Sequence, residues 1–360
     1  MPENKMTNKR VTLGLSGGVD SLVTAILLKQ QGYEICGVHL RLYDDTPGMM
    51  HEKNKLISTL VNKLGIEYHV RDISGLFESK IKKYIISEHE KGRTPSACAV
   101  CNPDVKLHSL LQIADELKCQ FIATGHYIRI LKFGSHFFIY QARDKIKDQS
   151  YFLWKVKENV LSKWLTPLGN LTKHEVRRIA REQHFMHAAG AKESMGLCFL
   201  RNQRYHSFLK SNLHPDFLKE GPVVNNRGKI IGKHFGIALY TTGQKKRLQL
   251  YDNQIKYAVK SINIENNTII ADQRENLYRK RFTISKRHFI DNNDLKRRNI
   301  QVKVRGVGKN PEGFAQLKAL NNEKVNIQLE YPAWAIAPGQ PVVCYVGDRL
   351  IGGGFIDRIY

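Results

Sequence analysis

Over residues 11–126 the chain alternates between short apolar runs and longer segments with the apolar spacing of helices. Runs of the first kind predict strands, and segments of the second kind predict helices. The expected strands are Val11–Leu15, Glu34–Leu42, Glu67–Asp72 and Gln120–Gly125. The expected helices are Val19–Gln31, Glu52–Leu64, Phe77–Lys91 and Val105–Leu117. This alternation predicts an α/β fold with a doubly wound, mostly parallel sheet whose ligands bind at the carboxyl ends of the strands.

The pattern predicts further elements beyond this region. The run Phe133–His136 contains Gly134 and indicates a turn between two strands. Two more helices are expected, at Lys155–Leu165 and Lys173–His184. Thr172 stands just before the second of these helices with Glu175 three residues on, which is the pattern of a capping box.

From about residue 205 onward, short alternating segments and glycine turns dominate, and helical patterns become scarce. This texture is typical of small β-rich modules and barrels. A chain of 360 residues is also too long for one compact core. We therefore expect three domains: a catalytic domain over 1–204, a small β-rich central domain over 205–275 and a barrel-like C-terminal domain over 276–360.

The net charge points to a polyanionic partner. Lys and Arg number 57 against 33 Asp and Glu, giving a formal charge of +24. Such an excess favours nucleic acid bound through its phosphates, although a basic proteome would produce the same balance. The basic clusters are spread along the chain: Lys245-Lys246-Arg247, Arg279-Lys280-Arg281 and Lys296-Arg297-Arg298. A long RNA fits this distribution better than a small acidic metabolite.

The sequence contains no apolar stretch of about 18 residues, so no membrane span is expected. Its first residues lack the apolar core of a signal peptide. We therefore expect a cytoplasmic location, and a structural disulfide framework is not expected for the six cysteines.

The most specific motif is the run Ser16-Gly17-Gly18-Val19-Asp20-Ser21, between an expected strand and an expected helix. Backbone N–H groups at a helix N-terminus attract anions, and glycines let the main chain approach an oxyanion closely. Hydroxyl groups of Ser16 and Ser21 add donors. The Walker pattern is excluded, because no Gly-Lys-Ser/Thr follows at the required spacing. The alternative is a glycine-rich turn that arose by chance.

Two thiols occur three residues apart, at Cys98 and Cys101, in a loop before an expected helix, and a third occurs at Cys198. A thiol near a helix N-terminus in basic surroundings has a lowered pKa, and its thiolate is the reactive form. A lone C-x-x-C is nevertheless a weak signal, since it is also compatible with zinc binding, disulfide exchange or plain burial.

The Ser16–Ser21 run resembles the pyrophosphate loop of the N-type ATP pyrophosphatases. The ordered motifs of the chain resemble the tRNA-specific 2-thiouridylases (the MnmA/TrmU family) over nearly its whole length. After the loop these motifs are Gly92-Arg93-Thr94-Pro95, Cys101-Asn102, Thr124-Gly125-His126-Tyr127, Lys147-Asp148-Gln149-Ser150-Tyr151-Phe152-Leu153, Gly196-Leu197-Cys198-Phe199, Tyr240-Thr241-Thr242-Gly243-Gln244, Pro338-Gly339-Gln340 and Gly352-Gly353-Gly354.

The resemblance implies ATP-dependent 2-thiolation of the wobble uridine (U34) of tRNA. Adenylylation of the uracil C2 oxygen makes it a leaving group, with Mg²⁺ and the loop stabilising the departing pyrophosphate. Implied ATP-binding residues are Gly14, Leu15, Ser16, Gly17, Gly18, Val19, Asp20, Ser21, Leu40 and Gly125. Cys198 would carry persulfide sulfur, and Cys101 would be the nucleophile that releases it or acts directly on the activated base. A transient Cys101–Cys198 disulfide is the implied by-product.

The resemblance also implies tRNA contacts, some beside a base flipped out of the anticodon stem-loop and two in the C-terminal domain. They are Ser96, Ala97, Cys98, His126, Lys147, Asp148, Gln149, Arg305 and Gln340. Alternatively, His126 caps a strand and Lys147-Asp148-Gln149 is a solvated turn. The implied partners are tRNA and a sulfur-donor or persulfide relay protein, and a monomer is expected.

The chain departs from the family pattern at several positions. Ser96-Ala97-Cys98 stands where Asn-Pro-Asp or Asn-Pro-Cys is common, so a thiol replaces a carboxylate suited to acid–base work. Cys98, Cys101 and Cys198 could then hold a [4Fe–4S] cluster with one open iron. Lys245-Lys246-Arg247 and Met195 also differ from the usual residues. These departures leave open a paralogue that thiolates another RNA pyrimidine, or one that binds RNA without catalysis.

Overall fold

The computed structural model describes residues 9–43, 47–191, 196–200, 203–252 and 254–360, with only the backbone described for 47–54. The described chain divides into two compact units. Of the described residues, the first contains those up to 80, those from 100 to 191 and 348–350, and the second contains 81–99, those from 196 to 347 and 351–360. The three-domain division expected from the sequence stays a prediction. No helix of the described part is long and apolar enough to cross a membrane.

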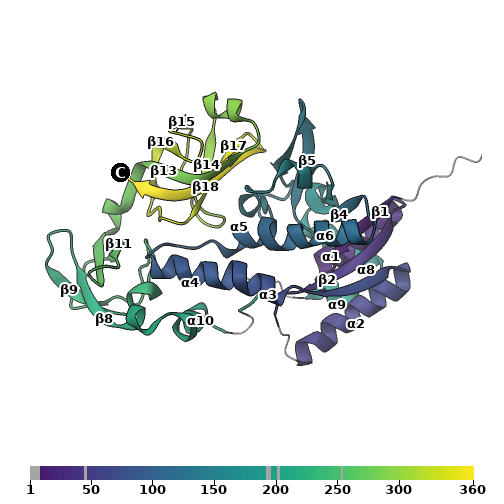
Figure 1. Ribbon diagram of the computed structural model, residues 1–360, viewed down its shortest axis with the longest axis horizontal. Coiled ribbons are helices and arrows are strands. Elements are labelled where there is room, and N and C mark those ends of the chain that lie inside the picture. The colour runs from purple at the N-terminus through teal and green to yellow at the C-terminus, as the bar shows by residue number, and fades with distance from the viewer. Residues whose placement is uncertain (1–8, 44–46, 192–195, 201–202, 253) are drawn as a thin grey trace, which may run out of the picture. The chain divides into compact units, whose positions relative to one another are not determined.

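The first unit is built on a parallel five-stranded sheet with the order β3-β2-β1-β4-β7 (Figure 1). Its strands are β1 (Arg10–Gly14), β2 (Glu34–Arg41), β3 (Glu67–Asp72), β4 (Phe121–Ala123) and β7 (Trp164–Leu165). Its helices are α1 (Val19–Gln30), α2 (Pro47–Leu64), α3 (Ser74–Phe77), α6 (His108–Glu116), α7 (Glu158–Leu161), α8 (Lys173–Glu182) and α9 (Met186–Gly190). The parallel α/β fold predicted from the hydrophobic pattern is confirmed.

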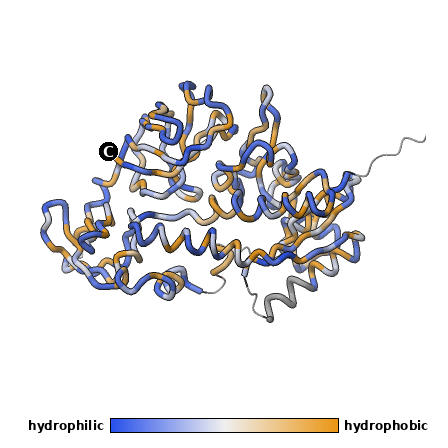
Figure 2. The backbone as a smooth tube through the Cα atoms, in the orientation of Figure 1, coloured by the Kyte–Doolittle hydropathy of each residue, from blue (hydrophilic) through white to orange (hydrophobic). Residues whose placement is uncertain are grey.

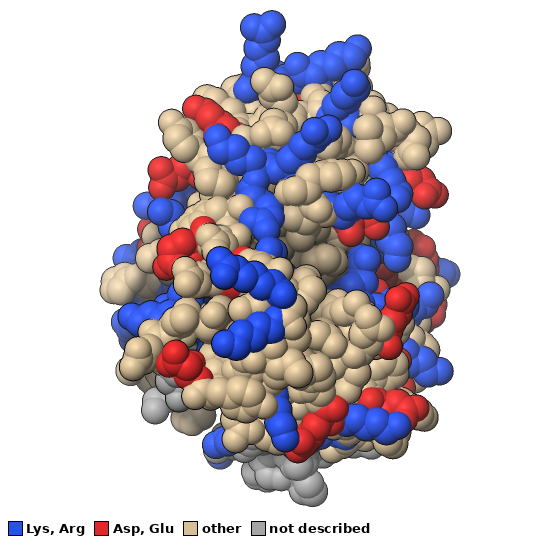
Figure 3. Space-filling model, turned by 90° about the vertical axis from the view of Figure 1, so that its left-hand side faces the viewer, with Lys and Arg blue, Asp and Glu red and all other residues tan. Residues whose placement is uncertain are grey.

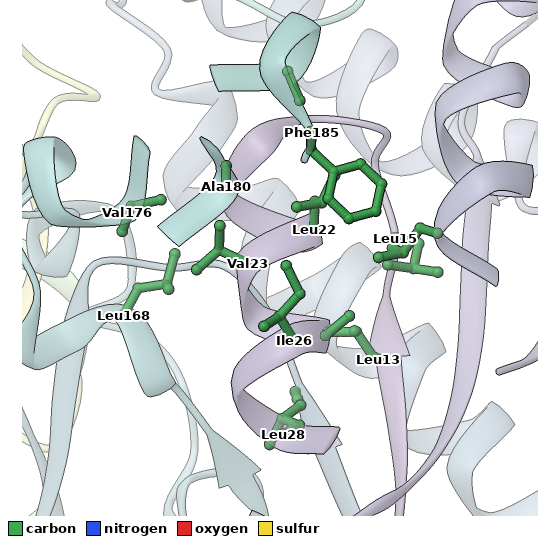
Figure 4. Close-up of a cluster of buried hydrophobic side chains, with 14 of the residues drawn as sticks. Leu13, Leu15, Leu22, Val23, Ile26, Leu28, Leu168, Val176, Ala180 and Phe185 are labelled. Carbon is green, nitrogen blue, oxygen red and sulfur yellow. The ribbon is translucent and has the colours of Figure 1, made fainter. Parts of the chain in front are cut away.

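Helices cover both faces of this sheet because alternate residues of β1 point to opposite sides. Leu13 and Leu15 pack into a buried cluster with α1 (Figure 4). On the other side, a side chain at Gly14 would meet Leu110 of α6 at 3.3 Å. The helices carry mixed hydrophobic and polar positions (Figure 2), as expected for helices with one buried face.

Two local predictions are confirmed in this unit. Strands β5 (Ile128–Phe133) and β6 (His136–Gln141) form an antiparallel hairpin around the expected turn. Helix α8 begins with the expected capping box, in which the Thr172 hydroxyl accepts from the Glu175 N–H and the Glu175 carboxylate accepts from the Thr172 N–H.

The helix expected at Lys155–Leu165 is wrong over most of its length. Only the four residues of α7 are helical, and Trp164–Leu165 forms β7 at the edge of the sheet. The backbone N–H of Ile122 donates to Lys163 at 2.9 Å, and the two residues of β7 pair with β4. The hydrogen bonds that Trp164–Leu165 gains as an edge strand beside β4 therefore prevail over the helix that the local sequence pattern favours.

In the regions of two expected helices, the structure has short α-helices separated by π-helical segments. The Phe77–Lys91 region contains the end of α3, a π-helical segment (Glu78–Lys82) and α4 (Lys83–Glu90). In the second region, α5 (Ala97–Cys101) and a π-helical segment (Asn102–Leu107) precede α6. Short 3₁₀ turns occur at Ser150–Phe152, Pro167–Asn170, Pro215–Leu218, Ile237–Leu239, Arg274–Leu277 and Asn292–Lys296.

The second unit is rich in β-structure, as predicted. Helix α10 (Tyr205–Asn212) precedes a sheet with the order β10-β9-β8-β12-β11. These strands are β8 (Glu220–Val224), β9 (Ile230–Phe235), β10 (Gln249–Leu250), β11 (Tyr257–Asn263) and β12 (Thr268–Gln273). The barrel-like region has the order β14-β17-β18-β13-β16-β15. Its strands are β13 (Tyr278–Phe289), β14 (Gln301–Lys303), β15 (Ala315–Ala319), β16 (Val325–Trp334), β17 (Pro341–Val346) and β18 (Arg349–Ile359).

Candidate nucleotide and thiol sites

The glycine loop between β1 and α1 has the shape that the sequence predicts. Gly17 adopts φ +76°, a region that favours glycine. The Ser16 and Ser21 hydroxyl oxygens lie 3.2 Å apart, and the Ser21 hydroxyl donates to the Gly18 carbonyl at 3.0 Å. Gly18 is the N-cap of α1 and supplies no capping side chain. The loop is thus held by its own serines, and no capping side chain takes the first N–H groups of α1. Such N–H groups at a helix N-terminus are suited to binding an anion.

Gly125 follows β4 and packs directly on the beginning of α1. A Cβ atom at this position would lie 2.8 Å from the carbonyl carbon of Asp20 and 3.0 Å from the backbone nitrogen of Ser21. Only glycine allows this approach without moving the backbone. Because Gly125 has no side chain, the end of β4 can lie directly against the glycine loop.

The other predicted ATP-binding residues lie at the same edge of the sheet. The backbone N–H of Leu15 donates to Val38 at 2.8 Å, and a ring nitrogen of His39 lies 2.9 Å from the Leu15 carbonyl oxygen. Leu40 is half-buried near the end of β2. The carboxyl ends of β1, β2 and β4 thus converge, where ligands of such sheets bind.

Sequence reasoning missed two residues that contact Asp20. The Lys173 ammonium lies 2.7 Å and 2.8 Å from the two carboxylate oxygens of Asp20. The Tyr127 hydroxyl donates to the same carboxylate at 2.7 Å. The position of Lys173 beside the capping box was visible in the sequence, but no motif linked it to the loop.

His126 belongs to a small polar cluster behind the end of β4. Its Nδ1 lies 2.7 Å from the Thr124 hydroxyl oxygen, which also accepts from the Trp164 indole N–H at 2.9 Å. Desolvation of the ring, with the nearby charge of Lys106 as a second cause, lowers the pKa of His126 to about 3. The ring is therefore neutral at physiological pH, and it can contribute a hydrogen bond but no positive charge.

The three candidate thiols differ in exposure. Cys101, the last residue of α5, is buried in the first unit, whereas Cys98 is half-buried and Cys198 is exposed, both in the second unit. Cys344 and Cys36 are two further buried thiols. Burial raises the pKa of Cys344 to about 12. Desolvation and a hydrogen bond to Glu67 raise the pKa of Cys36 as well. A raised pKa favours the protonated thiol, which is a poor nucleophile.

Among the described residues, no group of three or more His, Cys, Asp or Glu side chains could hold a metal ion. An iron–sulfur cluster at Cys98, Cys101 and Cys198 stays a prediction. Met195, one of the departures from the family pattern, lies outside the described residues.

Within the second unit, the structure places Gln340 beside the segment that leads to Ser96, Ala97 and Cys98. The Thr94 N–H donates to the Pro338 carbonyl at 2.8 Å. A Cβ atom at Gly339, where φ is +87°, would lie 2.9 Å from the Thr94 carbonyl oxygen. The Gln340 side chain accepts from the Ala337 N–H at 3.2 Å, which closes the turn.

The predicted tRNA contacts at Asp148 and Gln149 also shape their own loop. Asp148 accepts from the Ala142 N–H at 3.1 Å, and Gln149 exchanges two hydrogen bonds with the backbone of Tyr127. Lys147 donates its N–H to the Asp144 carbonyl at 3.2 Å. This loop therefore holds the backbone of Tyr127, whose hydroxyl donates to Asp20.

Arg305 lies in a cationic cluster around an indole ring in the second unit. Its guanidinium donates to the backbone carbonyl groups of Trp334 and Ala335 and lies 5.4 Å from the centre of the Trp334 ring. The Lys245 ammonium lies 4.6 Å from the same ring. Lys and Arg side chains are also spread widely over the face in Figure 3, which suits a polyanionic partner.

Three family models match the chain. They are the tRNA methyl transferase HUP domain over residues 9–202, the tRNA methyl transferase PRC-barrel domain over residues 206–272 and the Aminomethyltransferase beta-barrel domain over residues 279–356.

Similar proteins of known name cover nearly the whole chain. The tRNA-specific 2-thiouridylase MnmA 3 of Phocaeicola vulgatus is 38% identical over 358 residues, covering 97% of this chain and 94% of that protein. MnmA 1 of Caldanaerobacter subterraneus is 38% identical over 363 residues, covering 98% of each. A solved structure, the U34-tRNA thiolase NcsA from Methanococcus maripaludis with its [4Fe-4S] cluster, aligns with a TM-score of 0.34 and 19% identity. It covers 57% of this chain and 70% of that one, a likeness too weak to bear on the site. On the strength of the full-length relatives, the chain belongs to the tRNA-specific 2-thiouridylase family.

Proposed function

We propose that this protein is an ATP-dependent tRNA-uridine 2-sulfurtransferase acting on the wobble uridine. The observation that carries the proposal is the glycine loop at the N-terminus of α1, which is held by hydrogen bonds of Ser16 and Ser21. It occurs in a chain that is 38% identical over 358 residues to a tRNA-specific 2-thiouridylase.

In the first half-reaction, the loop binds the phosphates of ATP. Attack by the uracil C2 oxygen on the α-phosphorus forms an O–P bond and breaks the bond to the pyrophosphate leaving group. Mg²⁺ supplies charge neutralisation on the departing phosphates when it is bound. The Asp20 carboxylate is the group of the loop that would hold it, since Mg²⁺ prefers oxygen ligands. The N–H groups of α1 stabilise the negative charge that develops.

In the second half-reaction, sulfur replaces the activated oxygen. A relay protein loads Cys198, whose exposure suits an intermolecular transfer, with persulfide sulfur. The Cys101 thiolate attacks the Cys198 sulfur and releases hydrosulfide, which adds to C2 and expels AMP. Alternatively, the persulfide attacks C2 first, and Cys101 then resolves the adduct. Either order leaves a Cys101–Cys198 disulfide, which a dithiol reductant must reduce before the next turnover.

We assign base and tRNA recognition to Ser96, Ala97 and Cys98 near the flipped base and to His126, Lys147, Asp148, Gln149, Arg305 and Gln340 around the RNA. No step is routed through a cluster. We also propose a monomer, with the reaction taking place in the cytoplasm, where tRNA is used.

The test is mass spectrometry of nucleosides from tRNA incubated with the enzyme, ATP, Mg²⁺ and a sulfide or persulfide source. We expect 2-thiouridine at the wobble position, absent without ATP and absent with Cys101→Ser when sulfur is supplied through Cys198. Cys119→Ser is a matched control, because that thiol takes part in no proposed step.

Other outcomes of this experiment contradict specific parts of the proposal. Thiolation at another pyrimidine would indicate a paralogue with a different RNA target. Tight RNA binding without thiolation under any sulfur source would indicate a binding protein. Stoichiometric iron after anaerobic purification, with activity lost on its removal, would replace the persulfide route by a cluster.

A further inference from the structure

The barrel-like region of the second unit carries a pocket of about 440 Å³. This volume lies in the range of sites that hold one small molecule, such as a single nucleotide. The residues that line the pocket all belong to the second unit: Thr283, Leu320, Lys324, Asp357, Arg358 and Tyr360. The glycine loop belongs to the first unit, so the proposed function makes no use of this pocket.

Strand pairing brings the polar lining groups to one side of the sheet. Thr283 of β13 lies opposite Arg358 of β18, and opposite residues of antiparallel strands point to the same side. Phe282 and Ile284, which flank Thr283, are in the buried core, so the pocket lies on the face away from that core. The Tyr360 hydroxyl oxygen lies 3.2 Å from the Thr283 hydroxyl oxygen on this face.

The charges and donors of the pocket fit an anion. The Lys324 ammonium lies 2.8 Å from the Asp357 carboxylate, so these two charges offset each other. Within the described part of the chain, the exposed Arg358 guanidinium has no acidic partner. Two hydroxyl groups carry two hydrogens, and the hydrogen bond between Thr283 and Tyr360 uses only one of them. A guanidinium and a spare hydroxyl donor together suit the oxygens of a phosphate group.

Tyr360 adds an aromatic surface to these donors. The residue is 54% exposed, and the Arg281 guanidinium lies 5.4 Å from the centre of its ring. The Tyr360 N–H donates to the Arg281 carbonyl at 3.0 Å, which fixes the start of the side chain. Nucleobases stack on such rings whatever their identity, and a nearby cation strengthens the contact. An inorganic anion or an acidic side chain would use the guanidinium and leave the ring unused, whereas a nucleotide uses both.

We propose that this pocket binds one ribonucleotide, with its phosphate on Arg358 and the Thr283–Tyr360 hydroxyl pair and its base on the Tyr360 ring. The same chemistry is offered by one residue of an RNA strand and by a free mononucleotide, and the experiment below separates these two sources. The inference goes beyond the proposed thiolation and does not depend on it.

The test is titration of the full-length protein with cytidine 5′-monophosphate and with hexacytidylate, an RNA strand without secondary structure. Cytosine is used because the proposed catalytic site takes an adenine nucleotide and a uracil base. Loss of a charge-assisted hydrogen bond in Arg358→Met should weaken binding by about tenfold to a hundredfold. Loss of the stacking surface in Tyr360→Leu should weaken it by about fivefold to a hundredfold. With hexacytidylate, Arg358→Met should also lower the slope of log K against log salt by about 0.7, and Tyr360→Leu should leave that slope unchanged.

Arg298→Met is a matched control, because Arg298 is an exposed arginine of the same unit that does not line the pocket. It should bind cytidine 5′-monophosphate as the wild type does. Hexacytidylate binding that is at least about tenfold tighter than mononucleotide binding assigns the site to an RNA strand, and a smaller difference assigns it to a free mononucleotide.

The inference is wrong if neither probe binds at millimolar concentration, or if Arg358→Met binds both probes as Arg298→Met does. Because Arg358 is exposed, its replacement leaves the core intact, and this comparison stands even if Tyr360→Leu does not fold by circular dichroism. Absence of thiolation by a protein that binds cytidine 5′-monophosphate would contradict only the proposed function.

Discussion

The hydroxyl group of Tyr205 lies 2.8 Å from Nε2 of His89, inside the second unit. The other ring nitrogen of His89 lies 2.8 Å from the Ala238 carbonyl oxygen, and only 1% of the residue is exposed. A neutral ring satisfies both contacts, because Nδ1–H donates to the carbonyl and Nε2 accepts from Tyr205. Burial lowers the pKa of His89 to about 4. The ring thus joins α4 and α10 to the 3₁₀ turn at Ile237–Leu239.

This relationship predicts a pH-dependent stability. The unfolded state binds a proton on His89 near pH 6.5 and the folded state only near pH 4, so stability falls as pH decreases through this window. Between about pH 7.5 and about pH 5 we expect this group to cost about 2 kcal/mol of unfolding free energy. His89→Gln should flatten the slope by that amount in urea unfolding. Tyr205→Phe should destabilise the protein by about 1 kcal/mol but keep the slope; equal slopes for wild type and His89→Gln would refute the assignment.

Gly125→Ala should damage both stability and nucleotide binding. The added Cβ would lie within 3.0 Å of backbone atoms of Asp20 and Ser21, which cannot rotate away. Overpacking of this kind costs about 1–3 kcal/mol, and it would displace the first turn of α1. Urea unfolding and ATP titration measure the two effects. Gly75→Ala is the control, because a Cβ atom there meets nothing within 4 Å; similar behaviour of the two variants would count against the close packing.

Cys198→Ser should abolish sulfur transfer and leave tRNA affinity nearly unchanged. The side chain is exposed, so the change removes no buried packing. Nucleoside mass spectrometry and filter binding of tRNA check the two parts. Thiolation that persists with a persulfide donor would show that another group carries the sulfur.

tRNA binding should weaken steeply with salt, because phosphate contacts release counterions. Lys245 and Lys246 are exposed, so their replacement by Ala leaves the core intact. Each lost phosphate contact should reduce the slope of log K against log salt by about 0.7 to 0.9. The matched control replaces both residues by Arg and keeps the charge. A salt response that is flat for the wild type would argue against RNA as the partner.

The sequence by itself determined the alternation of strands and helices in the first unit, the shape of the glycine loop and the capping box at Thr172. Each depends on short-range rules, because strand and helix periods, glycine torsions and helix caps involve residues only a few positions apart. The match to the ordered family motifs likewise needed no coordinates.

Only the tertiary structure decided the rest. It made Trp164–Leu165 an edge strand, paired Lys173 with Asp20 across 153 positions of the chain, and set Gly125 against α1. It also separated the buried, protonated thiols of Cys36 and Cys344 from the exposed thiol of Cys198. The physical reason is shared by all of these: sheet pairing, ion pairing and desolvation depend on which distant segments meet when the core closes. The pattern of side chains over a few neighbouring residues does not specify which distant segments meet.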